Sequence, residues 1–521
     1  MQQMKTLRYT ALLMVTLLLS ALTLAAKGGV GSVEIKIQNG EKWWGLVVEP
    51  ERIALPFDTP FVVNTSEFSP TLFRANMLLS NRGRYLCSKE SLTVSFDGKK
   101  IVVTAPEGSA APALQKSGRT LREAYLMCCH KNFPPSDVAV PELLFGSPVY
   151  VLGNKSELLV DQQGVEAFAE MLTQRGAPAG TILLPLGWSS PTGALTFDPE
   201  AFPSPKQMIA SLHEKGMKVM LSVTPYLMAS GRGYRLFHSE QRLLTDEAGE
   251  PIVFRSRLGY TACLNLTPEV VEQMAASIAA LGKEYGVYGF YFDCLDALPL
   301  LDDNLPKLTE FLDLWHSLGN SVEVAIYSTP VSRVLGNVAS SVSTTRHYTW
   351  ETLAQSLERS IDASLLGFER TSLAADLEFA QDGGELALRA AQLAALLPVA
   401  VIPYSVWSLE DTTPLCKMLS WRAKNSDYYV ELARLGASSA EPIVRHLEYQ
   451  FPRTGFTNCR DQFMIGNKWL VAPVVSESAL RMVRLPKGRW REYESGRVFK
   501  GPRVIDVDVT SGKVALFERV E

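Results

Sequence analysis

The chain has 521 residues, of which 46% are hydrophobic and 20% are charged. This composition argues against a disordered chain and supplies enough apolar material for a barrel-sized domain with one or two smaller domains. The net charge is −4, and acidic and basic residues are spread along the chain. Neither nucleic acid nor an anionic membrane surface is therefore an expected partner.

The first 26 residues have the pattern of a secretory signal peptide. Lys5 and Arg8 precede the apolar run ALLMVTLLLSALTLAA, and the small residues Thr23 and Ala25 offer a cleavage site. The run has about the minimum length that spans a bilayer, so an uncleaved signal anchor is the alternative. We therefore expect a protein that is secreted, lies in the lumen of the secretory pathway, or is anchored to a membrane by this segment.

Export would make glycosylation and disulfide formation relevant. Glycan acceptor motifs begin at Asn64, Asn154 and Asn265. Seven cysteines permit up to three disulfides. Three of them fall in one β-rich region, where we expect Cys87 to pair with Cys128 or Cys129, and the sequence does not decide between these two.

The sequence lacks the short motifs of metal, nucleotide and redox sites. It contains no CxxC pair, no HExxH, no phosphate-binding P-loop and no glycine-rich dinucleotide motif, and its six histidines are scattered. We therefore expect neither a metal ion nor a cofactor.

The sequence contains three regions with different hydrophobic patterns. Residues 27–135 contain short alternating runs such as SVEIKIQ, LTVSFDG and KIVVTAP between turn residues, which predicts an N-terminal β-sandwich. Residues 136–448 alternate helical segments with short apolar strands, which is typical of a parallel sheet and, without a dinucleotide turn, favours a (β/α)₈ TIM barrel. Residues 449–521 return to short β-runs and predict a small C-terminal β domain.

Two segments of the barrel region can be interpreted in detail. In SPKQMIASLHEKGMKVMLSV, a helix is expected to stop at Gly216 and a strand to follow over 219–223. In LNLTPEVVEQMAASIAALGKEYGVYGFYF, Thr267 is the expected N-cap of a helix that ends near Gly282, before a strand over 287–292. That strand ends at Asp293, at the edge where barrel enzymes carry their catalytic groups.

Five segments resemble, in order along the chain, the motifs of glycoside hydrolase family 31, and within it the branch of the myogenesis-regulating glycosidase. They are LTFDPEAFPSPKQMIASLHEKGMKVMLSVTPYL, LNLTPEVVEQM, EPIVRHLEYQFP, DQFMIGNKWLVAPVV and RLPKGRWREY. The resemblance runs over roughly 140–500 and implies a retaining α-glycosidase with a carbohydrate or glycoconjugate substrate. In this family the nucleophile is an aspartate that ends the fourth barrel strand, and the matching residue is Asp293.

The acid/base position departs from the family pattern. The matching segment is SVSTTRHYTWETLAQSL, where Thr345 or His347 stands in place of the expected carboxylate. A retaining glycosidase uses two carboxyl groups about 5–5.5 Å apart. The alternatives are that His347 donates the proton, as an imidazolium can near neutral pH, or that Glu351, Asp376 or Glu378 supplies a carboxylate.

The expected sugar contacts also differ. Pro185 and Leu186 stand where relatives place acidic residues that hold sugar hydroxyls, and Glu378 and Phe379 replace small glycines after Asp376, which would narrow the pocket. Substrate-binding candidates are Trp188, Tyr260, Asp376 and Trp407. Aromatic side chains such as these more often pack in a core than bind sugars.

Two functions follow from these observations. The first is an active glycosidase of the secretory pathway with Asp293 as nucleophile and an atypical proton donor. The second is a catalytically inactive, glycosidase-like pseudoenzyme that binds a sugar or acts as an accessory module for a membrane or secretory-pathway protein.

Overall fold

The computed structural model describes residues 31–49, 52–132, 140–153, 160–189, 195–331, 338–342, 347–375, 377–379 and 384–520. The signal-like segment, Asn154, Thr345 and Asp376 lie outside the described residues. The chain divides into two compact units, one of residues 1–134 with 447–459 and one of residues 135–446 with 460–521. The exact limits of the three predicted domains stay predictions.

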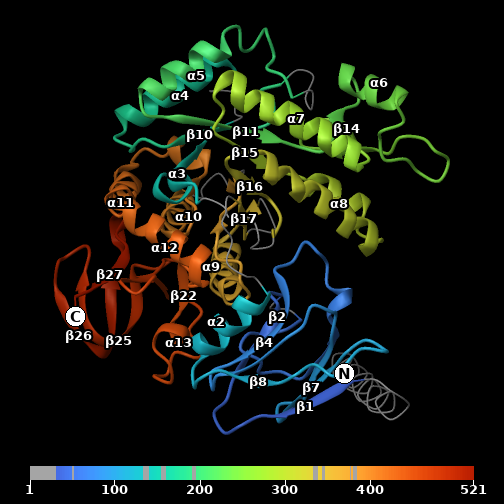
Figure 1. The fold of residues 1–521 in the computed structure, drawn as a ribbon. Helices are drawn as coiled ribbons and strands as arrows, with labels where there is room; N and C mark the ends of the chain where they lie inside the picture. Colours follow the sequence, from blue (N-terminus) through green and yellow to red (C-terminus); the bar gives the residue numbers. More distant parts are fainter. Residues whose placement is uncertain are drawn as a thin grey trace, which may run out of the picture. The chain divides into compact units, whose positions relative to one another are not determined.

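The first unit contains two antiparallel four-stranded sheets, as the alternating sequence pattern predicted (Figure 1). One sheet has the order β1 (Ser32–Lys36), β7 (Lys100–Thr104), β6 (Thr93–Phe96) and β3 (Phe61–Asn64). The other has the order β2 (Trp43–Val47), β4 (Arg74–Ser80), β5 (Arg84–Cys87) and β8 (Gln115–Lys116). The unit also holds α2 (Leu121–Asn132) and α13 (Leu447–Gln450). Strand β7 alternates buried and partly exposed residues, which is the period-2 pattern of a half-buried strand.

The second unit is built on an eight-stranded parallel sheet, so the predicted (β/α)₈ barrel is confirmed. Its strands follow chain order: β9 (Val149–Val151), β10 (Thr181–Leu184), β11 (Lys218–Val223), β15 (Gly289–Phe292), β16 (Ala325–Tyr327), β17 (Val338–Ser341), β19 (Thr371–Ser372) and β21 (Val401–Ile402). Strand β21 lies at one edge of this sheet, where it pairs with β9, and β19 lies at the other edge. The Val399 N–H donates a 3.1 Å hydrogen bond to the Thr371 carbonyl, which links these two edges.

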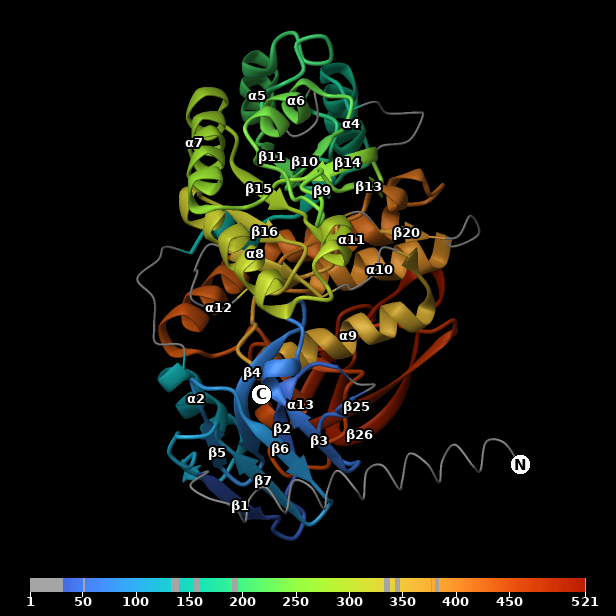
Figure 2. The same cartoon turned by 90° about the vertical axis from the view of Figure 1, so that its right-hand side faces the viewer.

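Helices cover the outside of the barrel strands (Figure 2). They are α3 (Glu142–Gly146), α4 (Gln162–Gln174), α5 (Pro205–Glu214), α7 (Pro268–Tyr285), α8 (Leu305–Ser317), α9 (Trp350–Leu365), α10 (Gly384–Leu396), α11 (Thr413–Lys424) and α12 (Ser426–Ser439). A further short helix, α6 (Arg232–Ser239), follows the third barrel strand. None of the helices in the described part of the chain is long and apolar enough to cross a membrane.

The two segments interpreted from sequence largely match the structure. Gly216 has φ 76° directly after helix α5, as a left-handed helix stop requires. The Thr267 hydroxyl caps α7 by accepting a hydrogen bond from the Val270 N–H. The predicted stop at Gly282 is wrong: α7 continues to Tyr285, and the left-handed stop is Gly286 with φ 76°. The helix passes through the first glycine and ends at the second, where a left-handed residue terminates it.

A buried arginine holds part of the barrel together. Arg422 in α11 is fully buried and donates hydrogen bonds of 2.6 to 2.9 Å to four carbonyl oxygens, those of Phe145, Ala395, Leu397 and Pro398. Its guanidinium also lies 4.0 Å from the Tyr429 ring centroid. Three of the carbonyls belong to the C-terminal end of α10 and the residues just after it, where the helix dipole favours a cation.

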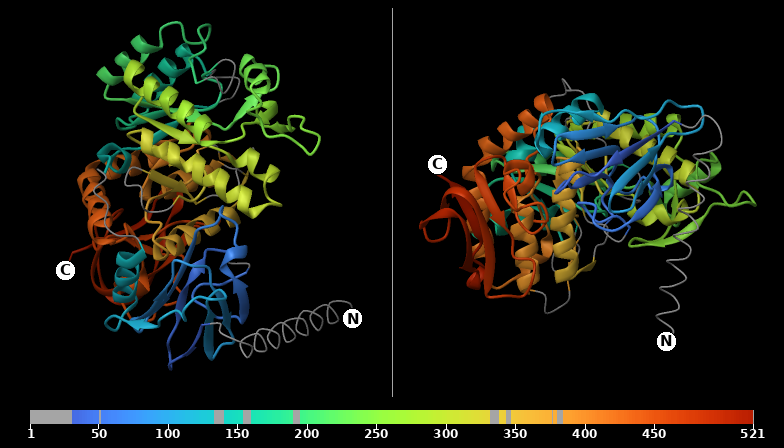
Figure 3. Two further views of the ribbon diagram at one scale, coloured as in Figure 1. Left: turned by 45° about the vertical axis from the view of Figure 1, so that its right-hand side comes forward. Right: turned by 90° about the horizontal axis from the view of Figure 1, so that it is seen from below.

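A six-stranded antiparallel sheet forms the C-terminal part of the second unit, beside the barrel helices (Figure 3, red). Its order is β22 (Val444–His446), β23 (Phe463–Ile465), β24 (Trp469–Ala472), β27 (Ala515–Arg519), β25 (Leu480–Glu492) and β26 (Val498–Asp508). The sheet confirms the predicted C-terminal β fold, and its first strand begins a few residues before the predicted domain limit.

Candidate active site

Asp293 follows the fourth barrel strand. All four residues of β15 are buried, and the Asp293 N–H still donates a 2.9 Å hydrogen bond to the Val223 carbonyl at the end of β11. The pairing of these two strands therefore fixes the backbone at Asp293, at the carboxyl edge of the barrel. The Asp293 side chain is 0% exposed.

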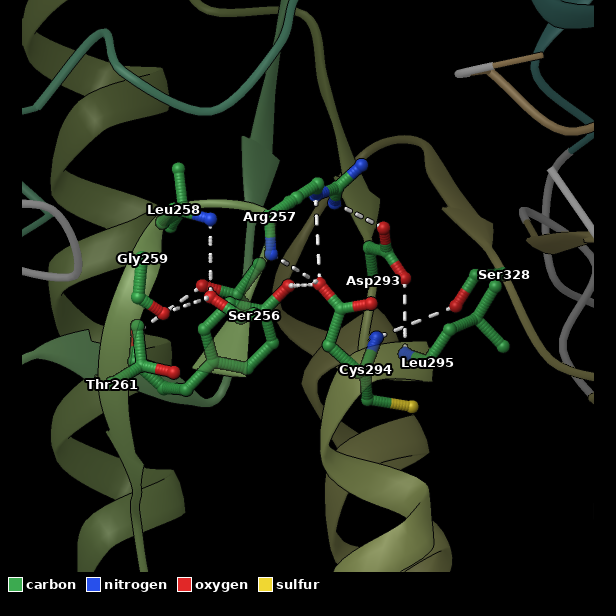
Figure 4. A network of polar contacts seen from close by, with 12 residues as sticks. Ser256, Arg257, Leu258, Gly259, Thr261, Asp293, Cys294, Leu295 and Ser328 are labelled. Carbon is green, nitrogen blue, oxygen red and sulfur yellow. Dashed lines mark hydrogen bonds and ion pairs between the residues drawn. The ribbon is translucent and has the colours of Figure 1, made fainter. Parts of the chain in front are cut away.

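Arg257 contacts the Asp293 carboxylate from a neighbouring hairpin (Figure 4). The hairpin consists of β13 (Val253–Ser256) and β14 (Gly259–Cys263), which follow the third barrel strand, and Arg257 lies in its turn. Arg257 Nη2 donates a hydrogen bond to Asp293 Oδ2, while the Leu295 N–H donates a 3.1 Å bond to Oδ1. Both carboxylate oxygens therefore accept hydrogen bonds in this conformation.

A second carboxylate shares the same guanidinium. Asp296 Oδ2 lies 3.9 Å from Arg257 Nε and accepts hydrogen bonds from the Arg257 N–H at 3.4 Å and the Tyr226 hydroxyl at 3.2 Å. The Arg257 side chain is 30% exposed. It therefore lies between solvent and the two acidic groups that it contacts. Arg257 was not predicted as a site residue, because no local sequence pattern marks a contact between a hairpin turn and a strand end 36 residues later.

The residue after the candidate nucleophile contributes no reactive group. The Cys294 N–H donates to Ser328 Oγ at 3.3 Å, and the Cys294 side chain is buried. Burial, together with the nearby charge of Asp293, raises the pKa of the Cys294 thiol well above its ordinary value. Cys294 therefore stays a neutral packing residue beside the carboxylate.

The structure brings two proton-donor candidates together. Strand β18 (His347–Tyr348) pairs in parallel with β20 (Glu378–Phe379), with His347 opposite Glu378. His347 Nδ1 lies 2.9 Å from Glu378 Oε2, and the two side chains are 82% and 61% exposed. These short strands follow the sixth and seventh barrel strands, so the pair lies beyond the carboxyl ends of the barrel, as Asp293 does.

The remaining candidates are dispersed. Glu351 is exposed in the first turn of α9, where it accepts a 3.5 Å hydrogen bond from Gln355. The Phe379 ring packs 5.8 Å from the ring of Tyr348, which is buried. Leu186, which stands at an expected acidic position, is buried as well. No group of three or more His, Cys, Asp or Glu residues placed to hold a metal ion occurs in the described ranges.

Two of the aromatic candidates are core residues. Trp188 is buried, donates its ring N–H to the Ser222 carbonyl at 2.8 Å and packs edge-on against Phe197. Trp407 is buried and packs edge-on against Tyr150. Neither ring presents a face to solvent. Tyr260, in contrast, is 73% exposed in strand β14 of the Arg257 hairpin.

Two family models match this chain. The model of the glycosyl hydrolases family 31 TIM-barrel domain covers residues 140–310, and that of the family's C-terminal domain covers residues 440–520. The chain therefore contains the TIM-barrel and C-terminal domains of glycosyl hydrolase family 31. The first match includes Asp293 and Arg257, whereas His347 and Glu378 lie between the two matched ranges.

The curated relatives of this chain are distant. The myogenesis-regulating glycosidase of Mus musculus is 26% identical over 424 residues, which cover 74% of this chain and 57% of the relative. An alpha-glucosidase of Saccharolobus solfataricus is 21% identical over 474 residues, which cover 78% of this chain and 66% of the relative. The first likeness is consistent with the branch that the sequence motifs indicated. This chain spans less than two thirds of the length of either relative.

Solved structures of family 31 proteins share the fold. A dextranase from Flavobacterium johnsoniae in complex with glucose has a TM-score of 0.74 at 15% identity, covering 95% of this chain and 67% of that chain. A sulfoquinovosidase from E. rectale in complex with an aza-sugar inhibitor has a TM-score of 0.75 at 16% identity, covering 94% and 82%. At these identities the likeness concerns the fold alone.

Proposed function

We propose that this protein is an O-glycosyl hydrolase that cleaves α-glycosides with retention of configuration and uses Asp293 as its nucleophile. The observation that carries the proposal is the position of Asp293, at the carboxyl end of the fourth strand of a family 31 barrel and inside the matched range 140–310. Barrel enzymes carry their catalytic groups at that edge.

The first chemical step would form a glycosyl ester on Asp293. One carboxylate oxygen attacks the anomeric carbon while the bond to the leaving oxygen breaks, and that oxygen takes a proton from the His347 imidazolium. Glu378 would orient the ring, because its carboxylate lies 2.9 Å from the ring nitrogen Nδ1. In the second step His347 takes a proton from water, and the resulting nucleophile attacks the anomeric carbon and releases Asp293.

Arg257 sets a condition for this reaction. The Asp293 side chain is 0% exposed and both of its oxygens accept hydrogen bonds, so an oxygen has to be released before it can attack. The Leu295 N–H belongs to the backbone next to Asp293, whereas Arg257 belongs to a separate hairpin. We therefore propose that the Arg257 side chain withdraws when substrate binds, leaving Oδ2 free.

A second candidate function rests on the same contact. If the Arg257 side chain stays in place, its ion pair with Asp293 keeps the carboxylate from reacting, and the chain is a pseudoenzyme. Its partner would then be a sugar or a membrane or secretory-pathway protein. The signal-like first 26 residues support the secretory pathway as the location in either case.

Hydrolysis of aryl α-glycosides with good leaving groups separates the two functions. Such substrates need little help from an acid, so turnover depends mainly on the nucleophile. A panel of sugars assayed between pH 4 and 8 should include one that is hydrolysed by the native protein and not by the Asp293→Ala variant. Absence of turnover on every sugar, from protein shown to be folded, would refute the hydrolase and favour the pseudoenzyme.

A further inference from the structure

Three thiols lie on adjacent elements of the N-terminal unit, far along the chain from Asp293. Cys87 ends strand β5, and Cys128 and Cys129 lie near the end of helix α2, which packs against β5 (Figure 2). Cys128 Sγ donates a 3.9 Å hydrogen bond to the carbonyl of Leu86, one residue before Cys87, which places the Cys128 thiol within hydrogen-bonding reach of the Cys87 sulfur. All three cysteines are free thiols.

The surroundings give the two bonded thiols different roles. The Cys128 hydrogen bond, aided by the charge of Lys131 and opposed by burial, lowers the pKa of Cys87 to about 7. The same hydrogen bond and burial raise the pKa of Cys128 well above its ordinary value. Cys87 is also the more accessible of the pair, being half-buried where Cys128 is fully buried. Cys87 is thus the thiol that more readily forms the attacking thiolate, and Cys128 is the protonated partner.

We propose that Cys87 and Cys128 are a redox-responsive thiol pair that closes to a disulfide bond between β5 and α2 by exchange with a low-molecular-weight disulfide. The Cys87 thiolate attacks one sulfur of the small disulfide, forming a mixed disulfide and releasing a small thiolate. Cys128 then loses its proton to that thiolate and attacks Cys87 Sγ, which expels the second half as a thiolate. The pair loses two electrons and the small disulfide gains them.

Three further thiols are poorly placed for this exchange. Cys263 and Cys294 are fully buried in the barrel unit, and burial raises the pKa of both. Cys129 is as buried as Cys128, but the hydrogen bond to Cys87 comes from Cys128. The disulfide that the sequence predicted for Cys87 is not formed in the structure, where Cys87, Cys128 and Cys129 are all free thiols.

Peptide mapping of the full chain tests the proposal. The reduced protein is incubated with oxidised glutathione at pH 7, free thiols are alkylated under denaturing conditions, and peptides are analysed by mass spectrometry. We expect a Cys87–Cys128 cross-link that lacks two hydrogens, with Cys129 alkylated. In Cys128→Ala, a glutathione adduct should persist on Cys87, and Cys129→Ala should form the same cross-link as the native protein. A Cys87–Cys129 link, or a glutathione adduct that persists on Cys87 in the native protein, would overturn the proposal.

The pH dependence of alkylation provides a second readout that a purely structural role would not change. The rate at which iodoacetamide labels Cys87 in the folded, reduced protein should rise with a midpoint near pH 7. Because the Cys128 thiol stabilises the thiolate, the midpoint should move to higher pH in Cys128→Ala and stay in place in Cys129→Ala. Equal midpoints in all three proteins would refute the proposed pairing.

Discussion

Arg257 donates a hydrogen bond to Asp293 across the gap between a hairpin turn and the end of the fourth barrel strand. The arginine also contacts Asp296, so one guanidinium is shared by two carboxylates. A cation at this position neutralises the buried charge of Asp293 and at the same time occupies the oxygen that a glycosidase nucleophile needs. The contact with Arg257 therefore stabilises the folded protein and at the same time lowers the reactivity of Asp293.

Replacing Arg257 should lower the stability of the protein and raise its hydrolytic activity. In Arg257→Leu, the free energy of unfolding should fall by about 1–3 kcal/mol, because a buried carboxylate loses its partner. Hydrolysis of an aryl α-glycoside should rise on the order of tenfold, corresponding to about 1.4 kcal/mol in the barrier. Urea unfolding and kcat/KM measure the two effects. Arg255→Leu, an exposed arginine two residues earlier, is the matched control and should change neither. A loss of turnover in Arg257→Leu would mean that the arginine assists catalysis.

Leaving-group dependence should identify the proton donor. In His347→Asn, kcat/KM for alkyl or sugar leaving groups should fall about 10²–10⁴-fold, while activated aryl glycosides should be affected far less. Both His347 and Glu378 are exposed, so Tm should stay unchanged. His238→Asn, at an exposed histidine in α6, serves as the control. Equal losses on both substrate classes would exclude His347 as the acid.

Arg422 should not tolerate lysine. An ammonium has three donors on one nitrogen, whereas the guanidinium of Arg422 satisfies four buried carbonyls from two nitrogens. Carbonyls left without a donor cost about 1–3 kcal/mol each, so Arg422→Lys should lower the free energy of unfolding by several kcal/mol. The urea midpoint measures this. Arg434→Lys, on the exposed face of α12, should leave the midpoint within error, and an equal result for both variants would contradict the account.

His316 should make the protein less stable in acid. Its ring nitrogen Nε2 lies 2.9 Å from Thr329 Oγ1, and burial lowers its pKa from 6.5 to about 4. The unfolded chain therefore binds a proton at a pH where the folded chain does not, so this contribution is complete above pH 6.5 and is lost as the pH falls toward 4. The loss amounts to up to about 3 kcal/mol. His316→Gln should flatten the stability profile between these pH values, and an unchanged slope would refute this role.

The barrel was predictable from sequence because its signals are local. Caps such as Thr267, the left-handed stop at Gly216 and the apolar run before Asp293 each lie within one segment of the chain. Helix ends are less certain when two glycines follow each other, as Gly282 and Gly286 showed.

The site was only partly predictable because its contacts join distant segments. Arg257 and Asp293 meet because the hairpin after the third barrel strand reaches the end of the fourth, and His347 and Glu378 meet through pairing of two short strands. The exposure of a side chain also depends on distant segments. Trp188 and Trp407 are aromatic residues of the kind that bind sugars, but the surrounding elements bury them.

Covalent trapping tests the central claim most directly. A fluorinated glycosyl fluoride with a good leaving group forms the glycosyl ester quickly and hydrolyses it slowly, so the intermediate accumulates on the nucleophile. With a sugar that the native protein accepts, digestion and mass spectrometry should find one glycosyl group on the peptide that contains Asp293. The same peptide should remain unlabelled in Asp293→Asn. A label on a different carboxylate, or no label in a protein that hydrolyses the parent glycoside, would contradict the assignment of Asp293 as the nucleophile.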